Sequence, residues 1–242
     1  MKTTIRGLLA VSVLVSVASA AAAQETVETI IEGLPETLRA QFEGAPQDVR
    51  VAAWGEWTPS AQPWKWCHSE SYQGNPWRVT VTEELRRLVD GLIAEGVVES
   101  FEVSDSNGEA SQQINQIRAF IDSGCSIITS IPGSATALDD AIDAAAEAGI
   151  PFVTAAGSVT SPNAVNVDSN YARWGYDMMV AIGEAFPDGA NVLLVEGIAG
   201  HPIVVQEREG ADKALEEYPN LKVARSVNGD WTANVTKTVV LQ

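Results

Sequence analysis

The segment Ser71-Tyr72-Gln73-Gly74-Asn75-Pro76-Trp77-Arg78 joins a strand-like run to a helix-like run. Residues 64–71 before it are predicted to form a strand, and the apolar residues of 76–95 recur on one face of a helix. In an α/β sheet such a junction opens at the carboxyl ends of the strands, where ligands bind. The segment also brings together a large aromatic ring, a turn amide and a guanidinium. It therefore predicts both a fold class and the place of a binding site.

From this segment onward, strand-like and helix-like runs alternate. The predicted strands are 98–103, 125–131, 150–155, 164–167, 191–196 and 221–227, and the predicted helices are 111–123, 134–148, 171–186, 203–218 and one that begins at 232. Alternation of this kind indicates parallel sheets that are covered by helices on both faces. We therefore predict an α/β protein with two Rossmann-like lobes.

A run of Gly, Ser, Thr and Pro at residues 157–163 interrupts the alternation and has the composition of a linker. The predicted organisation is a signal peptide at 1–23, an N-terminal extension at 24–62, a first α/β lobe at 63–157, a hinge crossing at 158–163 and a second α/β lobe at 164–242. The second lobe has only about three predicted strands, fewer than is usual for such a sheet. We therefore expect the second lobe to be truncated.

The N-terminus has the pattern of an export signal. Lys2 and Arg6 precede an apolar run at residues 8–17, and Ala-rich sites for cleavage follow, with cleavage expected before Gln24. The apolar run is short for a membrane span. We therefore predict a periplasmic protein. The formal net charge of −17 argues against nucleic acid or an anionic lipid surface as a partner.

The motifs of the common enzyme classes are missing from the sequence. There is no G-x-G-x-x-G or G-x-x-x-x-G-K-[ST] turn and no G-x-S-x-G elbow. The two histidines and two cysteines lack the spacing of a zinc site. We therefore predict no cofactor, no metal and no catalysis. Cys67 and Cys125 either form a disulfide, which an oxidising compartment permits, or remain buried thiols.

Two of the seven tryptophans occupy special positions. Trp77 and Trp231 each stand near the start of a helix after a strand, one in each predicted lobe. At the rim of an interlobe cleft, their rings would offer flat apolar faces to the C–H face of a sugar. The alternative is that they pack in the core, as we expect for most of the other tryptophans.

Several short pieces of the chain, in order, resemble periplasmic solute-binding proteins of the ribose-binding type, which serve sugar ABC transporters. The resemblance covers residues 63–242. The matching pieces are Gly74–Arg78, Ser130–Ser134, Ala148–Thr154, Val167–Asp168, Glu196–Gly200 and Gly229–Trp231. It implies two lobes that close around one ligand at a hinge.

The resemblance also implies a set of ligand-binding residues. Asn75 and Trp77 match the first-lobe ligand loop, Trp231 matches the second-lobe aromatic position, and Ile198 matches an apolar residue of the pocket. The full predicted set is Tyr72, Asn75, Trp77, Arg78, Asp168, Ile198, Arg208 and Trp231.

The chain departs from the ribose-type pattern at several binding positions. Ile131 stands where that type has Asn, Ala156 and Gly157 where it has an Asp-Arg pair, and Glu207 where it has Arg, with Arg208 one step on. These departures argue against a pentose. Arg78 and Arg208 would instead offer fork-shaped donors to a hydroxylated or acidic ligand.

The predicted function is therefore capture of a sugar, a polyol or a similar polar solute for an ABC importer. The expected partners are the small-molecule ligand and the permease in the inner membrane, and the protein is expected to be a monomer. Two alternatives remain open at this point: the ligand-binding component of a membrane sensor or chemoreceptor, and an exported carbohydrate-active enzyme.

Overall fold

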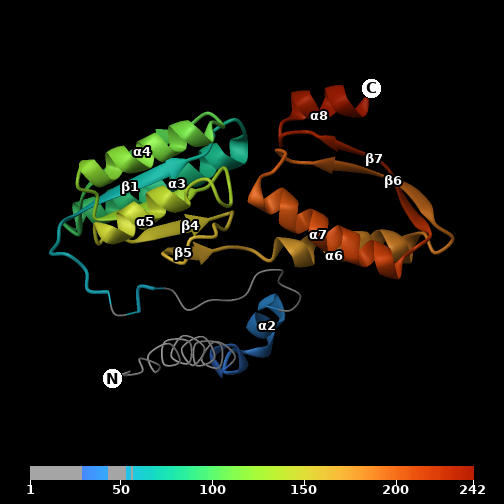
Figure 1. Cartoon of the computed structure of the whole chain (residues 1–242), viewed down its shortest axis with the longest axis horizontal. Coiled ribbons are helices and arrows are strands. Elements are labelled where there is room, and N and C mark those ends of the chain that lie inside the picture. The colour runs from blue at the N-terminus through green and yellow to red at the C-terminus, as the bar shows by residue number, and fades with distance from the viewer. Residues whose placement is uncertain (1–28, 43–52, 56) are drawn as a thin grey trace, which may run out of the picture. The chain divides into compact units, whose positions relative to one another are not determined.

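The structure, a computed structural model, describes residues 29–42, 53–55 and 57–242 (Figure 1). The chain divides into two compact units, residues 1–51 and residues 52–242. In the first unit, residues 29–32 are helical, and α2 (Glu36–Arg39) and η1 (Ala40–Phe42) follow Pro35. Pro35 separates the two helical pieces, because proline lacks the backbone N–H that a continuous helix needs. The predicted signal peptide lies outside the described residues.

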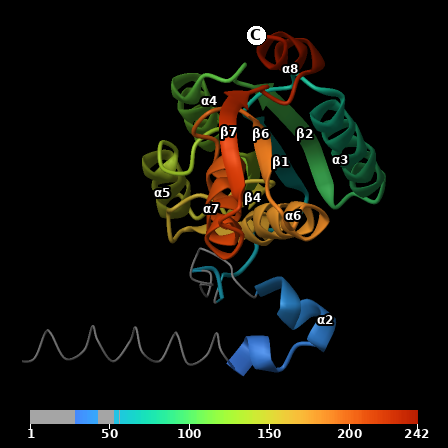
Figure 2. The ribbon, with the colours of Figure 1, turned by 90° about the vertical axis from the view of Figure 1, so that its right-hand side faces the viewer.

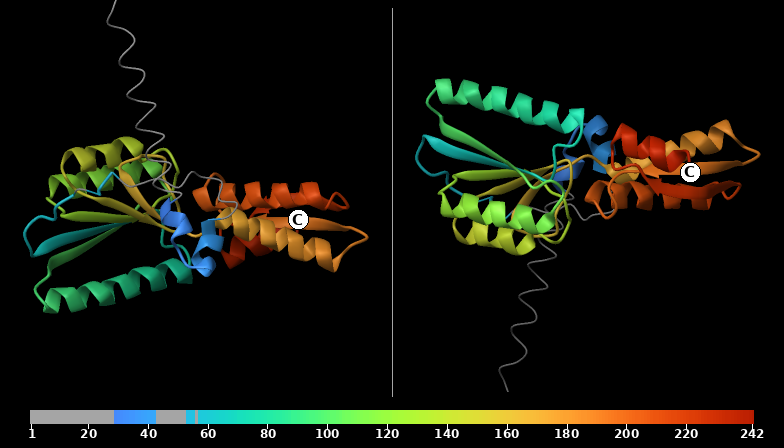
Figure 3. Two further views of the ribbon diagram at one scale, coloured as in Figure 1. Left: turned by 90° about the horizontal axis from the view of Figure 1, so that it is seen from below. Right: turned by 90° about the horizontal axis from the view of Figure 1, so that it is seen from above.

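The second unit contains a five-stranded sheet in which every neighbouring pair is parallel, with the order β2-β1-β3-β4-β5. Its strands are β1 (Trp64–Glu70), β2 (Val98–Asp105), β3 (Ile127–Ile131), β4 (Phe152–Ala155) and β5 (Ala164–Val167). Helix α3 (Pro76–Ala94) covers one face, and α4 (Ala110–Asp122) and α5 (Asp139–Glu147) cover the other (Figure 3). We call this sheet with its three helices the first lobe. The predicted α/β class and parallel sheet are confirmed.

The alternation along β1 gives the two faces of this sheet different chemistry, because successive side chains of a strand point to opposite faces. Cys67 belongs to the apolar core under α4 and α5, together with Ile117 and Leu138. His68 and Glu70 point to the face covered by α3, where Glu70 contacts side chains of that helix. The face under α3 is therefore buried and polar, and it leads directly to the segment at residues 71–78.

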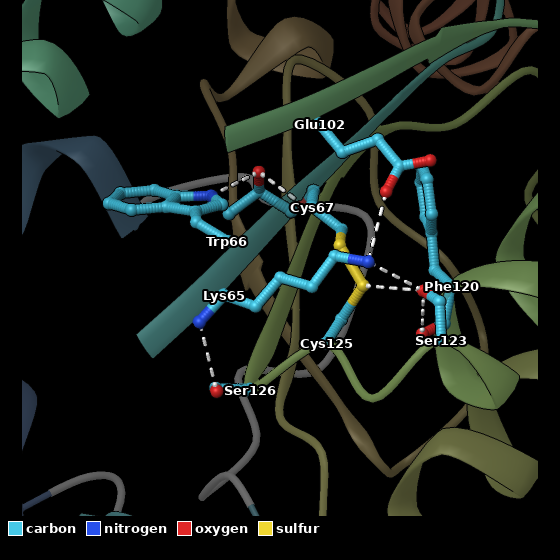
Figure 4. Close-up of a disulfide and its surroundings, with 9 residues drawn as sticks. Lys65, Trp66, Cys67, Glu102, Phe120, Ser123, Cys125 and Ser126 are labelled. Atoms are coloured by element: carbon cyan, nitrogen blue, oxygen red, sulfur yellow. Dashed lines mark hydrogen bonds and ion pairs between the residues drawn. A yellow bond between two sulfur atoms is a disulfide. The ribbon is translucent and has the colours of Figure 1, made fainter. Parts of the chain in front are cut away.

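Cys67 and Cys125 are joined by a disulfide that ties β1 to the turn between α4 and β3 (Figure 4). The sequence left the pairing open, and the structure decides it. Both sulfur-bearing residues are buried, with Cys67 0% and Cys125 3% exposed. Above them Lys65 pairs with Glu102 at 3.1 Å and donates to Ser123 Oγ at 2.9 Å.

A two-stranded parallel sheet and three helices form what we call the second lobe. Its elements are α6 (Tyr171–Ala185), β6 (Ala190–Glu196), α7 (Pro202–Glu217), β7 (Leu221–Asn228) and α8 (Ala233–Val240). Figure 2 shows β6 and β7 side by side. The core of the lobe joins Met179 of α6, Val192 of β6 and Ala214 of α7. A Cβ atom on Gly210 would lie 1.8 Å from the carbonyl oxygen of Ala172, so α6 and α7 are in backbone contact.

The boundary between the lobes differs from the predicted one. Residues 164–167 were assigned to the second lobe, but β5 pairs with β4 at the edge of the five-stranded sheet. Residues 157–163 therefore connect two strands of the first lobe, and the chain crosses to α6 after β5. A four-residue apolar run does not indicate which sheet it joins, because strand pairing is a non-local interaction. In the described part of the chain, no helix has the length and apolar character needed to cross a bilayer.

Candidate ligand-binding site

The segment that opens α3 is held by Asn75. Asn75 caps the helix, with its Oδ1 accepting from the Arg78 amide at 3.0 Å, and its Nδ2 donates to the Tyr72 hydroxyl at 2.8 Å. Pro76 follows at the first helical position, where its missing N–H costs nothing. A Cβ atom on Gly74 would lie 2.6 Å from the Tyr72 ring. Asn75 and Gly74 therefore fix the Tyr72 ring beside the first turn of α3.

Arg78 is the most deeply buried of the predicted ligand-binding residues, with 2% exposure. Its Nη1 donates to Glu70 Oε2 at 3.1 Å and to Ser71 Oγ at 2.9 Å. Its Cζ lies 4.5 Å from the centre of the Tyr72 ring, a cation–π contact. The charge of Arg78 is thus balanced inside the first lobe, which a buried ion needs.

Glu70 extends this contact into a buried network. Its Oε1 lies 3.2 Å from His68 Nε2 and accepts from Thr82 Oγ1 at 3.3 Å. On its other side His68 bonds Thr129 Oγ1 at 2.8 Å. Sequence reasoning missed Glu70 as a site residue. The signal was present, because His68 and Glu70 are two apart on a buried strand and therefore share a face.

The second lobe meets Arg78 through His201. His201 precedes α7, is 2% exposed, and places its Nε2 3.3 Å from Arg78 Nη2. Burial in the first place, and the charge of Arg78 in the second, lower the pKa of His201 to about 3, so the ring is neutral at neutral pH. From the turn at 196–202, sequence analysis assigned only Ile198 to the pocket and missed His201. A His directly before Pro at a helix start was the only local signal.

Trp231 completes this cluster. Its ring meets the His201 ring edge-on, with centroids 4.8 Å apart, and its centroid lies 6.0 Å from Arg78 Cζ. The indole lies against Gly197, because a Cβ there would be 2.0 Å from it. Trp231 has a φ of 52°, a left-handed conformation that costs energy for a bulky residue. The turn thus directs the indole toward Arg78 and His201.

Trp77 lies at the start of a helix and Ile198 lies in the connection between β6 and α7. Trp77 is the second residue of α3 and is 55% exposed. Among the described residues, its ring makes no contact with the Trp231 ring or with another aromatic ring. Ile198 lies half-buried between β6 and α7, and its carbonyl accepts from the His201 amide at 3.1 Å. A clamp formed by Trp77 and Trp231 stays a prediction.

Asp168 follows the edge strand β5 and binds the loop at 157–158. It accepts from the Gly157 amide at 3.1 Å, from Ser158 Oγ at 2.8 Å and from the Ser169 amide at 2.9 Å. Burial raises the pKa of Asp168, although these three hydrogen bonds oppose the shift. Its carboxylate therefore braces the chain where it passes to the second lobe.

A second acidic group lies on α7. Burial, and then the charge of Glu196, raise the pKa of Glu207 to about 7. The charges of Asp168, Glu207 and Arg78 all act on Tyr171, whose pKa is raised mainly by burial. Arg208, one residue on from Glu207, pairs with Asp212 at 2.8 Å and with Glu196 at 3.4 Å. The Arg208 guanidinium thus already pairs with two carboxylates of the second lobe.

The structure therefore brings together Tyr72, Arg78 and Trp231 from the predicted set and adds His201 to them. Two aromatic faces and one guanidinium meet here, and the acidic groups Asp168 and Glu207, whose pKa values are raised, act with Arg78 on Tyr171. Such a set can stack on an apolar face and exchange hydrogen bonds with hydroxyl groups. It holds no arrangement of nucleophile and base among the described residues of this cluster.

Residues 69–242 match the family described as periplasmic binding protein domain. The chain belongs to this family. The match extends over both lobes and includes the whole segment that opens α3. The resemblance stated from the short motifs is therefore confirmed, and so is the two-lobed α/β class.

Two curated relatives are binding proteins whose names give a ligand. The fructose import binding protein FruE of Bifidobacterium longum (strain NCC 2705) is 26% identical over 140 residues, which are 55% of this chain and 42% of FruE. The galactofuranose-binding protein YtfQ of Escherichia coli (strain K12) is 25% identical over 150 residues, which are 58% of this chain and 46% of YtfQ. The chain thus spans less than half the length of these relatives. Both are named as binding proteins, which supports the prediction that this family member is not an enzyme.

A solved structure shows the same fold. The ABC transporter solute binding protein from Thermobispora bispora DSM 43833 superposes with a TM-score of 0.69 at 24% identity. The superposition covers 74% of this chain and 56% of that chain. Over the part of the chain that superposes, the strands and helices therefore have the fold of that solute binding protein.

Proposed function

We propose that this chain belongs to a periplasmic solute-binding protein that captures a sugar or a related polyol and delivers it to an ABC importer. The observation that carries the proposal is the meeting of Tyr72 and Arg78 from the first lobe with Trp231 from the second. A ligand held by both lobes stabilises their closed arrangement, and closure is what a membrane partner can recognise. The names of FruE and YtfQ, one for fructose and one for galactofuranose, support a sugar as the ligand class.

Within this proposal the ligand contacts come from the aromatic and acidic groups more than from Arg78 alone. Trp231 supplies the apolar plate in the second lobe, and Trp77, which is exposed at the start of α3, supplies the plate from the first. Asp168 and Glu207 accept hydrogen bonds from sugar hydroxyls. Ile198 lines the same region as an apolar side chain. Asn75 acts mainly by shaping the segment that carries Tyr72 and Arg78.

The local charge favours a neutral ligand over an acidic one. Arg78 is already paired with Glu70, and Arg208 with Asp212 and Glu196. The acidic groups Asp168 and Glu207 have no such basic partner among their described contacts. A carboxylate on the ligand would therefore meet net negative charge. The sequence analysis allowed either a hydroxylated or an acidic ligand at Arg78 and Arg208, and we now propose the neutral, hydroxylated one.

The remaining parts of the proposal are the compartment and the partner. The export signal predicted at residues 1–23 and the disulfide agree with a periplasmic location, because disulfides persist in oxidising compartments. We propose an inner-membrane permease as the partner and a monomeric binding protein. A membrane sensor would use the same ligand site, and cross-linking to the membrane protein encoded beside this chain separates the two roles.

Calorimetric titration with fructose, galactose, arabinose and myo-inositol tests the ligand class. We expect one of these neutral compounds to bind, and Trp231→Ala to weaken that binding by at least about 30-fold, as for a buried aromatic anchor. The matched control is Trp57→Ala, because Trp57 contacts the Gly149 carbonyl at the amino end of β4, away from the site. Absence of binding across the panel, or equal affinity in wild type and Trp231→Ala, would refute the proposal. Recovery of a chemically altered compound would favour an enzyme instead.

A further inference from the structure

His201 makes a direct contact between the two lobes that involves no ligand. It is carried by the turn between β6 and α7, yet its Nε2 lies 3.3 Å from Nη2 of Arg78, which belongs to α3. The backbone of Pro132 in the first lobe also lies close enough to act on the pKa of the ring. A Cβ atom on Gly157 would lie 3.7 Å from its Cε1. The ring is therefore buried against three separate parts of the first lobe.

The chemistry of this contact requires a neutral imidazole. A guanidinium only donates, so Nε2 must carry the lone pair that accepts from Arg78. Nδ1 also faces the Ile203 amide at 3.3 Å, and a neutral ring can accept from only one of these two donors. The charged guanidinium is the stronger donor, which assigns the ring hydrogen to Nδ1. A protonated ring would instead place two positive groups in contact.

Arg78 is prepared for this contact before the lobes meet. Glu70 and Ser71 bind its Nη1, and its Cζ lies over the Tyr72 ring. Nη2 is left to point at the second lobe. On the other side, Trp231 packs edge-on against the His201 ring and limits its movement. Both partners thus lose little further freedom when the bond forms, which favours it.

We propose that His201 is a positioning residue that fastens the second lobe to Arg78 without any ligand, and that protonation of its imidazole releases this fastening. The inference rests on the proposed function, because it concerns closure of the proposed ligand site. The contact between His201 and Arg78 then contributes free energy to closure of the lobes. A ligand therefore has to contribute less binding free energy to close them. The contact also makes the binding protein open more readily in acid.

The direction of the pH effect follows from the two states of His201. In the open state the exposed ring has the ordinary pKa of about 6.5, whereas in the closed state the pKa is lowered to about 3. The closing constant is therefore highest above pH 6.5 and falls about tenfold per pH unit below it, until about pH 3. Between pH 7.5 and pH 5.0 the expected decrease is roughly 30-fold.

Other titratable groups surround the His201 ring, and their effect on lobe closure must be distinguished from the effect of the imidazole. They are Arg78 with Glu70 and Tyr72 behind it in the first lobe, Asp168, which bonds Gly157, Tyr171 on α6, Glu207 on α7, and Asp230 beside Trp231. Of these, Glu207 has a pKa of about 7, so it titrates in the same range. A variant that changes only His201 keeps all these groups and isolates the imidazole.

Distance measurement between spin labels on the two lobes, with no ligand added, tests the inference. Cys substitutions at Glu83 on α3 and Glu209 on α7 place labels on exposed positions, and the native cysteines are protected by their bridge. We expect a short-distance population at pH 7.5 whose ratio to the long-distance population falls about 30-fold at pH 5.0. His201→Gln keeps a neutral acceptor and should stay closed at both pH values. His201→Lys carries a charge and should be open at both.

The inference is overturned if the wild-type ratio is the same at both pH values, if His201→Gln responds to acid as the wild type does, or if His201→Lys stays closed. Nitrogen NMR gives an independent check, since the whole chain has two histidines. It should show the Nδ1–H tautomer for His201, and an Nε2–H tautomer would contradict the bond to Arg78. These measurements contain no sugar, so they can fail while sugar binding stands, and sugar binding can fail while they succeed.

Discussion

Loss of the Cys67–Cys125 bridge should lower the free energy of unfolding of the first lobe by an amount that the length of the closed loop predicts. The bridge joins residues 58 apart in the sequence. For a closed loop of that length, the chain-entropy relation gives a stabilisation of about 4 kcal/mol at 25 °C, through restriction of the unfolded chain. A change of that size corresponds to about a thousandfold change in the equilibrium between the native and the unfolded forms of the first lobe.

The burial of the bridge determines how the experiment must be done. Cys67 is 0% and Cys125 3% exposed, and the Lys65 ammonium bonds Ser123 and Glu102 above them (Figure 4). A reductant therefore has no access to the native sulfurs. The protein should be reduced in denaturant and refolded with reductant present, which keeps both sulfur atoms in the core and avoids the cavity that a substitution would leave.

Amide hydrogen exchange followed by mass spectrometry measures the loss in each lobe separately. Peptides from β1 and β3 should exchange faster by as much as about a thousandfold in the reduced protein, because these strands flank the bridge. Peptides from β6 and β7 serve as the internal control and should change little. Unchanged protection of β1 and β3 would show that the loop-entropy reasoning fails here. An equal loss in both sheets would show that the lobes do not unfold separately.

Two further predictions concern the second lobe. Gly210→Ala should lower the melting temperature, by an amount equivalent to about 1–3 kcal/mol, because the new methyl group would overlap a carbonyl of α6. The matched control is Gly91→Ala in α3, which has open space around it and should stabilise by up to about 1 kcal/mol. Equal effects of the two changes would contradict the close helix contact. The pKa of about 7 for Glu207 means that the folded state holds a proton that the unfolded state releases near pH 4.5. The contribution of Glu207 to stability is therefore greatest below pH 4.5 and is lost as the pH rises to 7. Thermal unfolding at pH 5.0 and 7.5 should show this loss in the wild type and less of it in Glu207→Gln, and identical pH profiles would refute it.

Several features of the fold followed from local patterns in the sequence. Apolar residues at helical spacing predicted α3, α4 and α6, and short apolar runs between them predicted β3, β4 and β6. The junction at residues 71–78 was placed correctly because Asn75 and Pro76 are local signals for a helix start. These signals are short-range, so they can be read without knowing which segments meet.

The partners of each element required the tertiary structure. Nothing local showed that β5 pairs with β4 in the first lobe, or that Cys67 lies beside Cys125. The same distinction between local signals and distant contacts applies to the candidate site. The sequence indicated Tyr72, Arg78 and Trp231 by type and position, but not that they meet.

By itself, then, the sequence determined the order of strands and helices and the class of fold, because these depend on the spacing of neighbouring residues. Only the tertiary structure decided that Glu70 neutralises Arg78 and that His201 reaches it from a segment 123 residues away. Contacts between distant segments depend on how the sheets and helices pack, and that packing leaves no periodic trace in either segment.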